Sequence, residues 1–107
     1  MDLGLPDGAT VISMRAIGLN QDGTANIFVG FQRTSLHNIG LSAQSIASIR
    51  ITPPGRGNPY NVTANADPAF AVVNNDDFHY ALALNASSVS ATDVVTVDSV
   101  ELVYTLP

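Results

Sequence analysis

The amino-acid sequence predicts an all-β protein, an antiparallel β-sandwich of about seven to eight strands with a jelly-roll arrangement. Three observations lead to this fold class. Apolar and polar residues alternate with a period of two along most of the chain, and no long window holds a convincing helical period. Lysine is absent and Glu101 is the only glutamate, although both residue types are common on helix surfaces. Glycine, proline, asparagine and aspartate separate the alternating segments, as turns require.

The length of 107 residues fits one domain, residues 1–107. The net charge of -5 argues against nucleic-acid binding and against a basic helix lying on a membrane surface. The absence of cysteine excludes disulfides, thiol catalysis and zinc-thiolate sites. No signal peptide and no apolar segment of membrane-spanning length is visible, so no membrane partner is expected.

The alternating pattern defines the expected strands in chain order. Their ranges are Ala9–Leu19, Thr24–Arg33, Ser45–Thr52, Tyr60–Ala66, Ala69–Val73, Phe78–Asn85 and Val94–Leu106. The turn Asn20–Gly23 lies between the first two strands, which are expected to pair as an antiparallel hairpin. The phase of alternation changes near Ile12–Ser13 and again near Asp98–Ser99, and each change predicts a β-bulge.

The strand Phe78–Asn85 alternates cleanly between apolar and polar or small residues. Its two faces are Phe78, Tyr80, Leu82 and Leu84 toward the core, and His79, Ala81 and Ala83 toward solvent. All four members of the first set are therefore expected to be buried.

Four segments, Leu5–Val11, Asn26–Arg33, Asn75–Leu82 and Val97–Tyr104, resemble a recurrent β-sandwich module of bacterial and phage-associated surface proteins. That module typically opens with LPxGAxI and closes with sVxIxY. This sequence has Asn75-Asp76 where the module prefers Asp-Asn. The resemblance covers most of the chain and implies a jelly-roll-like fold with a binding or assembly role. It supplies no catalytic or ligand-binding residues.

Catalytic arrangements find little support in the residues. No Gly-x-Ser-x-Gly motif is present, and His37 and His79 fall in a polar loop and on an outward strand face. Asp76 and Asp77 are adjacent in a turn, where aspartate is favoured for its turn propensity alone. We expect no enzymatic activity, no cofactor and no metal. A small hydrolase is the least favoured reading.

A calcium site is the strongest alternative for the carboxylates, because oxygen ligands can converge at one end of a sandwich. The candidate ligands are Asp22, Asp67, Asp76, Asp77 and Asp93. The spacing of a calcium-binding loop is absent, so this alternative stays secondary.

Two further residues are candidates for binding a partner. Arg56 lies in the proline- and glycine-rich connection Pro53–Pro59, where an exposed guanidinium can bind a carboxylate. Phe28 lies on an otherwise polar strand face whose neighbours are small and uncharged. Such a face suits packing against another subunit, or stacking on a sugar ring.

The sequence therefore predicts a non-catalytic structural module that forms a homo-oligomer, for which a trimer is the leading arrangement, and binds a capsid or another structural protein. A phage capsid decoration protein, or a tail or fibre component, is the expected setting, at a virion or extracellular surface. The candidate binding residues are Phe28, Arg56, Asp76, Asp77 and His79. The alternative is a carbohydrate-binding module, with calcium as a potential aid to glycan binding.

Overall fold

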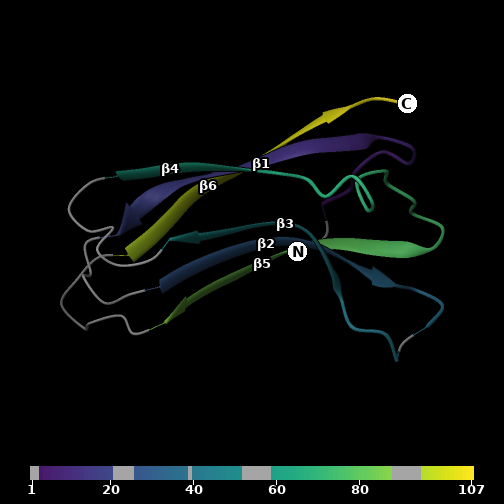
Figure 1. Cartoon of the computed structure of the whole chain (residues 1–107), viewed down its shortest axis with the longest axis horizontal. Coiled ribbons are helices and arrows are strands. Elements are labelled where there is room, and N and C mark those ends of the chain that lie inside the picture. Colours follow the sequence, from purple (N-terminus) through teal and green to yellow (C-terminus); the bar gives the residue numbers. More distant parts are fainter. Residues whose placement is uncertain (1–2, 21–25, 39, 52–58, 88–94) are drawn as a thin grey trace.

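The computed structural model describes residues 3–20, 26–38, 40–51, 59–87 and 95–107. These residues form two antiparallel three-stranded sheets packed face to face as a sandwich (Figure 1). The strands are β1 (Thr10–Asn20), β2 (Asn26–Ser35), β3 (Gln44–Ile51), β4 (Pro59–Asn65), β5 (Phe78–Ser87) and β6 (Val95–Thr105). The all-β prediction is confirmed.

The strand order is β4-β1-β6 in one sheet and β3-β2-β5 in the other. The expected hairpin between the first two strands is wrong, because β1 and β2 lie at the centres of different sheets. Each central strand is hydrogen-bonded along both edges by strands that follow later in the chain. The chain therefore changes sheets between β1 and β2.

The described residues contain six strands, fewer than expected, because the segment Ala69–Val73 does not form a regular strand. It makes a single β-bridge, between Val72 and Thr10. A turn occupies its beginning, since the Phe70 amide donates to the Asp67 carbonyl oxygen and the Ala69 amide donates to Asp67 Oδ1, both at 3.0 Å. The preceding Pro68 has no amide hydrogen to offer to a ladder.

Both expected bulges are present where β1 pairs with β6. The register shifts between Val11 and Ser13, so Ile12 is the extra residue and both Val11 and Met14 face the core. The second shift pairs Ile17 with Ser99 and Gly18 with Val97, which leaves Asp98 unpaired. Each bulge restores the inward phase of the apolar residues.

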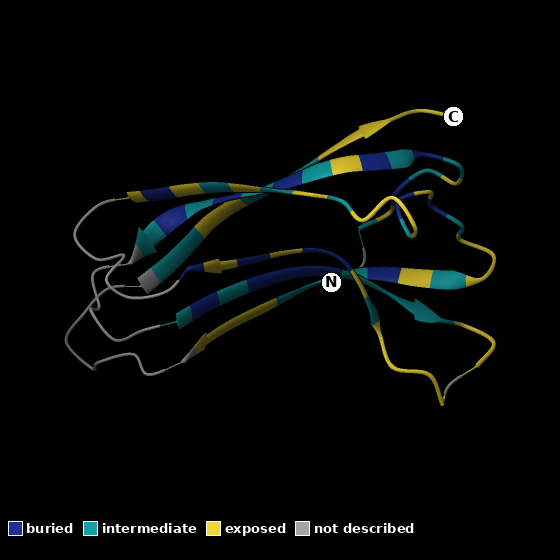
Figure 2. Cartoon of the chain, viewed as in Figure 1, coloured by how far each residue is buried: buried dark blue, intermediate teal, exposed yellow. Residues whose placement is uncertain are grey.

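The hydrophobic core lies between the two sheets and is continuous along the sandwich (Figure 2). Its largest fully buried side chains are Phe31, Met14, Ile27, Ile49, Val29 and Val73. These residues come from both sheets and from the segment after β4, so the sheets are held together mainly by burial of apolar surface. No helix in the described ranges is long and apolar enough to cross a membrane.

The two long sides of the sandwich differ. On one side β3 and β4 approach each other, whereas β5 and β6 on the other side are barely in contact. We call this second side, between edge strands β5 and β6, the open side. It is lined by Leu82, Leu84, Val97 and Val100.

Candidate functional site

The predicted carboxylate pair lies in the loop between β4 and β5, at one end of the sandwich. Asn74 shapes this loop: its carbonyl oxygen accepts the Phe78 amide at 3.0 Å and its Nδ2 donates to Asp77 Oδ2 at 2.8 Å. His37, from the loop after β2, places Nε2 3.0 Å from the Asp76 carbonyl oxygen and 3.2 Å from Asp77 Oδ1. Asp77 is thus contacted by one residue of its own loop and by one residue of the loop after β2.

Asn75, which follows Asn74 in this loop, is hydrogen-bonded to the segment before β1. The Asn75 amide donates to Asp7 Oδ1 and its side-chain Nδ2 donates to the Leu5 carbonyl oxygen, both at 2.8 Å. The Tyr80 hydroxyl accepts the Asn74 amide at 2.9 Å and lies 3.4 Å from the Val72 carbonyl oxygen. These bonds satisfy loop backbone groups that no strand partner reaches.

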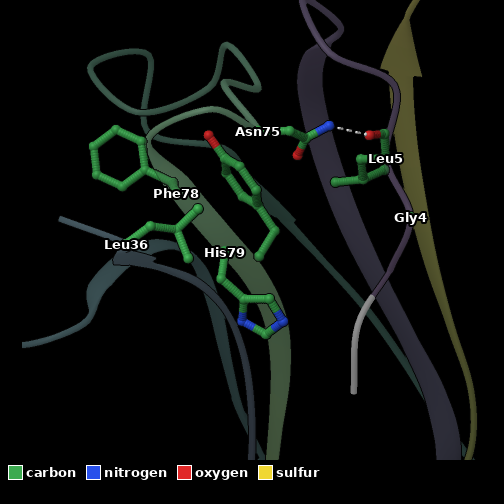
Figure 3. A pocket seen from close by; sticks show the side chains of 7 residues that line it. Gly4, Leu5, Leu36, Asn75, Phe78 and His79 are labelled. Atoms are coloured by element: carbon green, nitrogen blue, oxygen red, sulfur yellow. Dashed lines mark hydrogen bonds between the residues drawn. The ribbon is translucent and has the colours of Figure 1, made fainter. Parts of the chain in front are cut away.

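A pocket of about 270 Å³ lies beside this network. Figure 3 shows the residues that line it, which are Gly4, Leu5, Leu36, Asn75, Phe78, His79 and Tyr80. Its only imidazole is that of His79, and neither Asp76 nor Asp77 lines it. The Tyr80 hydroxyl is already bonded to the backbone. The pocket therefore offers apolar and aromatic surface with two polar side chains, rather than a paired acid and base.

The remaining candidate calcium ligands do not converge. Asp67 lies near the same end of the sandwich, but its side chain accepts the Ala69 amide. Asp22 and Asp93 lie outside the described residues. Among the residues that the structure describes, no group of three or more histidine or acidic side chains is placed to hold a metal ion.

Phe28 lies on the outer face of the β3-β2-β5 sheet, as the alternation predicts, but it is only half-exposed. Its ring covers Gly30 on the same strand, where an added Cβ atom would lie 2.9 Å from the ring. Arg50 on β3, paired with Phe28 in the ladder, places its guanidinium carbon 5.6 Å from the ring centroid. Much of the Phe28 surface is therefore used within the chain.

The four predicted site residues that the structure describes are not gathered in one place. Along β2, Phe28 pairs with Asn85, whereas His79 pairs with Thr34. The two positions on β2 are six residues apart, which is about 20 Å along the strand. Asp76 is near the His79 end. Arg56 lies outside the described residues.

Sequence reasoning missed the open side of the sandwich. Leu84 is 54 % exposed, so the expectation that it is buried in the core is wrong. Two adjoining hollows of about 250 and 150 Å³ lie along the open side, and both are lined by Leu84 and Val97. One signal was available: the sequence has no lysine, and neither β5 nor β6 contains proline, so both strands lack the residues that usually protect an exposed sheet edge.

The outer faces of the two sheets carry few charged side chains among the described residues. Among the described residues on the outer face of the β3-β2-β5 sheet, Arg50 carries the only permanent charge. On the other sheet, Arg15 Nη2 lies 2.6 Å from both carboxylate oxygens of Glu101, and this pair is neutral overall. The described acidic residues that are neither paired with arginine nor located at the β6 bulge are Asp7, Asp67, Asp76 and Asp77. All four belong to the end of the sandwich that carries the pocket.

No known protein family matches this sequence, and neither a curated protein nor a solved structure is significantly similar to it.

Proposed function

We propose that this protein is a non-catalytic structural module that self-associates and attaches to a larger particle, as a phage capsid decoration protein or a tail or fibre component. We also propose that the sandwich is a jelly roll and that the assembly is a trimer. The sandwich fold suits such a role, because it presents flat sheet faces and sheet edges to neighbours. The resemblance to surface-protein modules points the same way.

The observation that carries the proposal is the distribution of charge. The chain has a net charge of -5, and yet the described residues on the outer sheet faces include only one arginine without an acidic partner and one ion pair. In a contact between identical copies, a surface of one copy meets either the same surface or a different surface of the other copy. Like charges would oppose each other there, and weakly charged surfaces avoid that cost.

The pocket lined by Phe78, His79 and Asn75 supports one other candidate function, which is glycan binding. Phe78 and His79 provide ring surface, and Asn75 provides the Oδ1 acceptor of its side chain, in a hollow of about 270 Å³. Sugars are commonly held by this combination of ring surface and hydrogen-bonding groups. A glycan array probed with and without a chelator tests this candidate, and silence under both conditions rejects it.

Self-association is tested by measuring molar mass in solution over a wide range of protein concentration, using light scattering and sedimentation equilibrium. We expect an integral multiple of the chain mass of 11.2 kDa. A monomer at every concentration would refute self-association. The particle setting is tested separately by mass spectrometry of purified particles, and failure to find the protein on them would count against it.

A further inference from the structure

We propose that the open side between β5 and β6 is the surface through which two copies of this chain associate. The inference rests on the proposed function, since it names one surface that self-association uses; a two-fold contact joins copies in pairs, so a trimer would need a second contact elsewhere on the chain. In the proposed contact the two open sides face each other across a two-fold axis that runs parallel to the strands. Edge strand β6 of each copy then lies beside edge strand β5 of the other.

The first support is apolar surface that the isolated chain leaves uncovered. Leu84 is 54 % exposed although its phase on β5 is inward, and Leu82, Val97 and Val100 are half-buried around it. Among the described residues that line the two hollows, Asp98 is the only charged one. The free energy of the system falls when apolar side chains of another molecule replace the water in such hollows.

The second support is the state of the two edges. β5 and β6 are each an outer strand of a sheet, and they have similar lengths of 10 and 11 residues. Long edge strands without lysine or proline are prone to add a further strand. In Figure 1, β5 and β6 run in opposite directions. The proposed two-fold axis therefore makes each new strand pair antiparallel, like the pairs already present in both sheets.

The third support is charge. β6 carries Asp98 and Glu101, whereas β5 carries no acidic residue. Pairing β6 with β5 of the other copy keeps these carboxylates away from their own duplicates, which β6-to-β6 pairing would bring together. This favours the proposed arrangement over a symmetric β6 pair.

The area available is adequate for a dimer. A strip as long as ten strand residues and as wide as two stacked sheets with their edge side chains is about 700 Å² per copy. A standard stable interface buries about 800 Å² per partner. The open side alone thus approaches the usual size. We infer that the occupant is a second copy rather than a short peptide, because a single peptide strand cannot cover both edges.

The test is the substitution Leu84→Asp, which places a carboxylate in the middle of the proposed contact. We expect the dissociation constant to rise by about tenfold or more, because truncating a central contact residue has an effect of this size. Leu41→Asp is the matched control, since Leu41 is 56 % exposed and lies outside the open side. Val103→Asp tests a rival surface, the outer face of β6, where Val103 is 49 % exposed.

The outcomes separate this inference from the proposed function. If the unmodified chain is monomeric at every concentration, both fail. If it associates, and Val103→Asp disrupts the assembly while Leu84→Asp does not, self-association stands and the open side is the wrong surface. Circular dichroism shows whether each variant is folded.

A second measurement keeps the proposal testable if Leu84→Asp does not fold. The chain has no cysteine, so Ser99→Cys places a single thiol beside the open side, where Ser99 lines the larger hollow. We expect a bifunctional maleimide to link two copies of this variant. Ser48→Cys, on the outer face of the other sheet, is the control. Cross-linking of Ser48→Cys without cross-linking of Ser99→Cys would overturn the proposal.

Discussion

Tyr60 reaches across Gly18 and joins all three strands of its sheet. Gly18 on the central strand β1 pairs with Tyr60 on β4 and with Val97 on β6. The Tyr60 hydroxyl passes over the glycine and donates to the Thr96 carbonyl oxygen of β6 at 2.7 Å. A side chain at position 18 would occupy the space that the tyrosine ring crosses. The close approach of the two residues therefore explains a glycine in the interior of a strand, where it otherwise weakens the sheet.

We predict that Gly18→Ala lowers the free energy of unfolding by about 1–3 kcal/mol, the usual cost of overpacking. The added Cβ would collide with the Thr96 carbonyl oxygen and with the Tyr60 hydroxyl. Backbone cannot move aside as a flexible side chain can. Urea unfolding followed by circular dichroism measures the change.

Gly40→Ala is the matched control for this substitution. An added Cβ at Gly40 would find only Asn38 Oδ1, at an ordinary contact distance of 3.6 Å. We expect this variant to unfold within about 0.5 kcal/mol of the unmodified chain, as is usual at exposed positions. Equal losses for the two alanine variants would show that the close approach at Gly18 is not the cause.

The same tyrosine predicts a loss of stability in alkali. Burial, together with the nearby Asp98 carboxylate, raises the pKa of Tyr60 above its ordinary value. The folded state then holds the phenolic proton more tightly than the unfolded state. This contribution is complete below pH about 10 and is lost as the pH rises through the folded-state pKa.

Urea unfolding at a series of pH values through this range, for the unmodified chain and for Tyr60→Phe, measures the effect. The unmodified chain should lose more stability between neutral and alkaline pH than Tyr60→Phe does. Two profiles that fall in parallel would mean that Tyr60 titrates alike in both states.

Strand faces were predictable because a pleated strand exposes alternate residues to the core. Ile27, Val29 and Phe31 are buried, as the alternation on β2 requires. The bulges at Ile12 and Asp98 were also visible, since a bulge shifts the phase of the pattern. These features depend on residues close together in the sequence.

Strand pairing was not predictable in the same way. The alternation shows which face a strand buries but not which strand lies beside it, and the hairpin between β1 and β2 was wrong for that reason. Leu84 has the inward phase but is exposed, because burial there requires the two sheets to meet at the open side. The links from Asn75 to Asp7 and Leu5 likewise join segments that are far apart in the sequence.

Those links predict a local effect of Asn75→Ala. The substitution removes the bond from the side chain to the Leu5 carbonyl oxygen and leaves the backbone bond to Asp7 in place. We expect faster amide hydrogen exchange in the segment before β1, including the Gly8 amide that donates to Val73. The midpoint of thermal unfolding should change little, because the core is untouched.

Asn61→Ala is the control for Asn75→Ala, since Asn61 is exposed on β4 away from this end of the sandwich. Hydrogen exchange with mass spectrometry resolves the two regions. Unchanged exchange before β1 in Asn75→Ala would show that the segment is held without the side-chain bond.

The ion pair of Arg15 with Glu101 should contribute little to stability. Both side chains are more than one third exposed, so water and salt screen their attraction. We predict that Glu101→Gln changes the free energy of unfolding by less than about 1 kcal/mol and that added salt removes most of the difference. A larger loss that salt does not reduce would show that the pair is shielded from solvent, as a covering copy of the chain would cause.

Phe28 and Gly30 should be energetically coupled, because the aromatic ring covers the glycine on the same strand. In Phe28→Ala we expect a loss of about 1 kcal/mol, since the backbone at Gly30 becomes exposed to water. Gly30→Val alone should also destabilise, because its side chain competes with the ring for the same space. In the double variant valine fills the space that the ring leaves, and its preference for strands adds to stability.

The loss of unfolding free energy in the double variant should therefore be smaller than the sum of the two single losses, by about 0.5 kcal/mol or more. Urea unfolding of the unmodified chain, the two single variants and the double variant completes the cycle. Additive losses of unfolding free energy would show that the Phe28 ring does not stabilise the strand at Gly30. Molar mass measured on Phe28→Ala adds a second result. If Phe28 acts mainly within its own strand, as its cover over Gly30 indicates, the assembly persists in this variant; dissociation would instead place Phe28 in a contact between subunits.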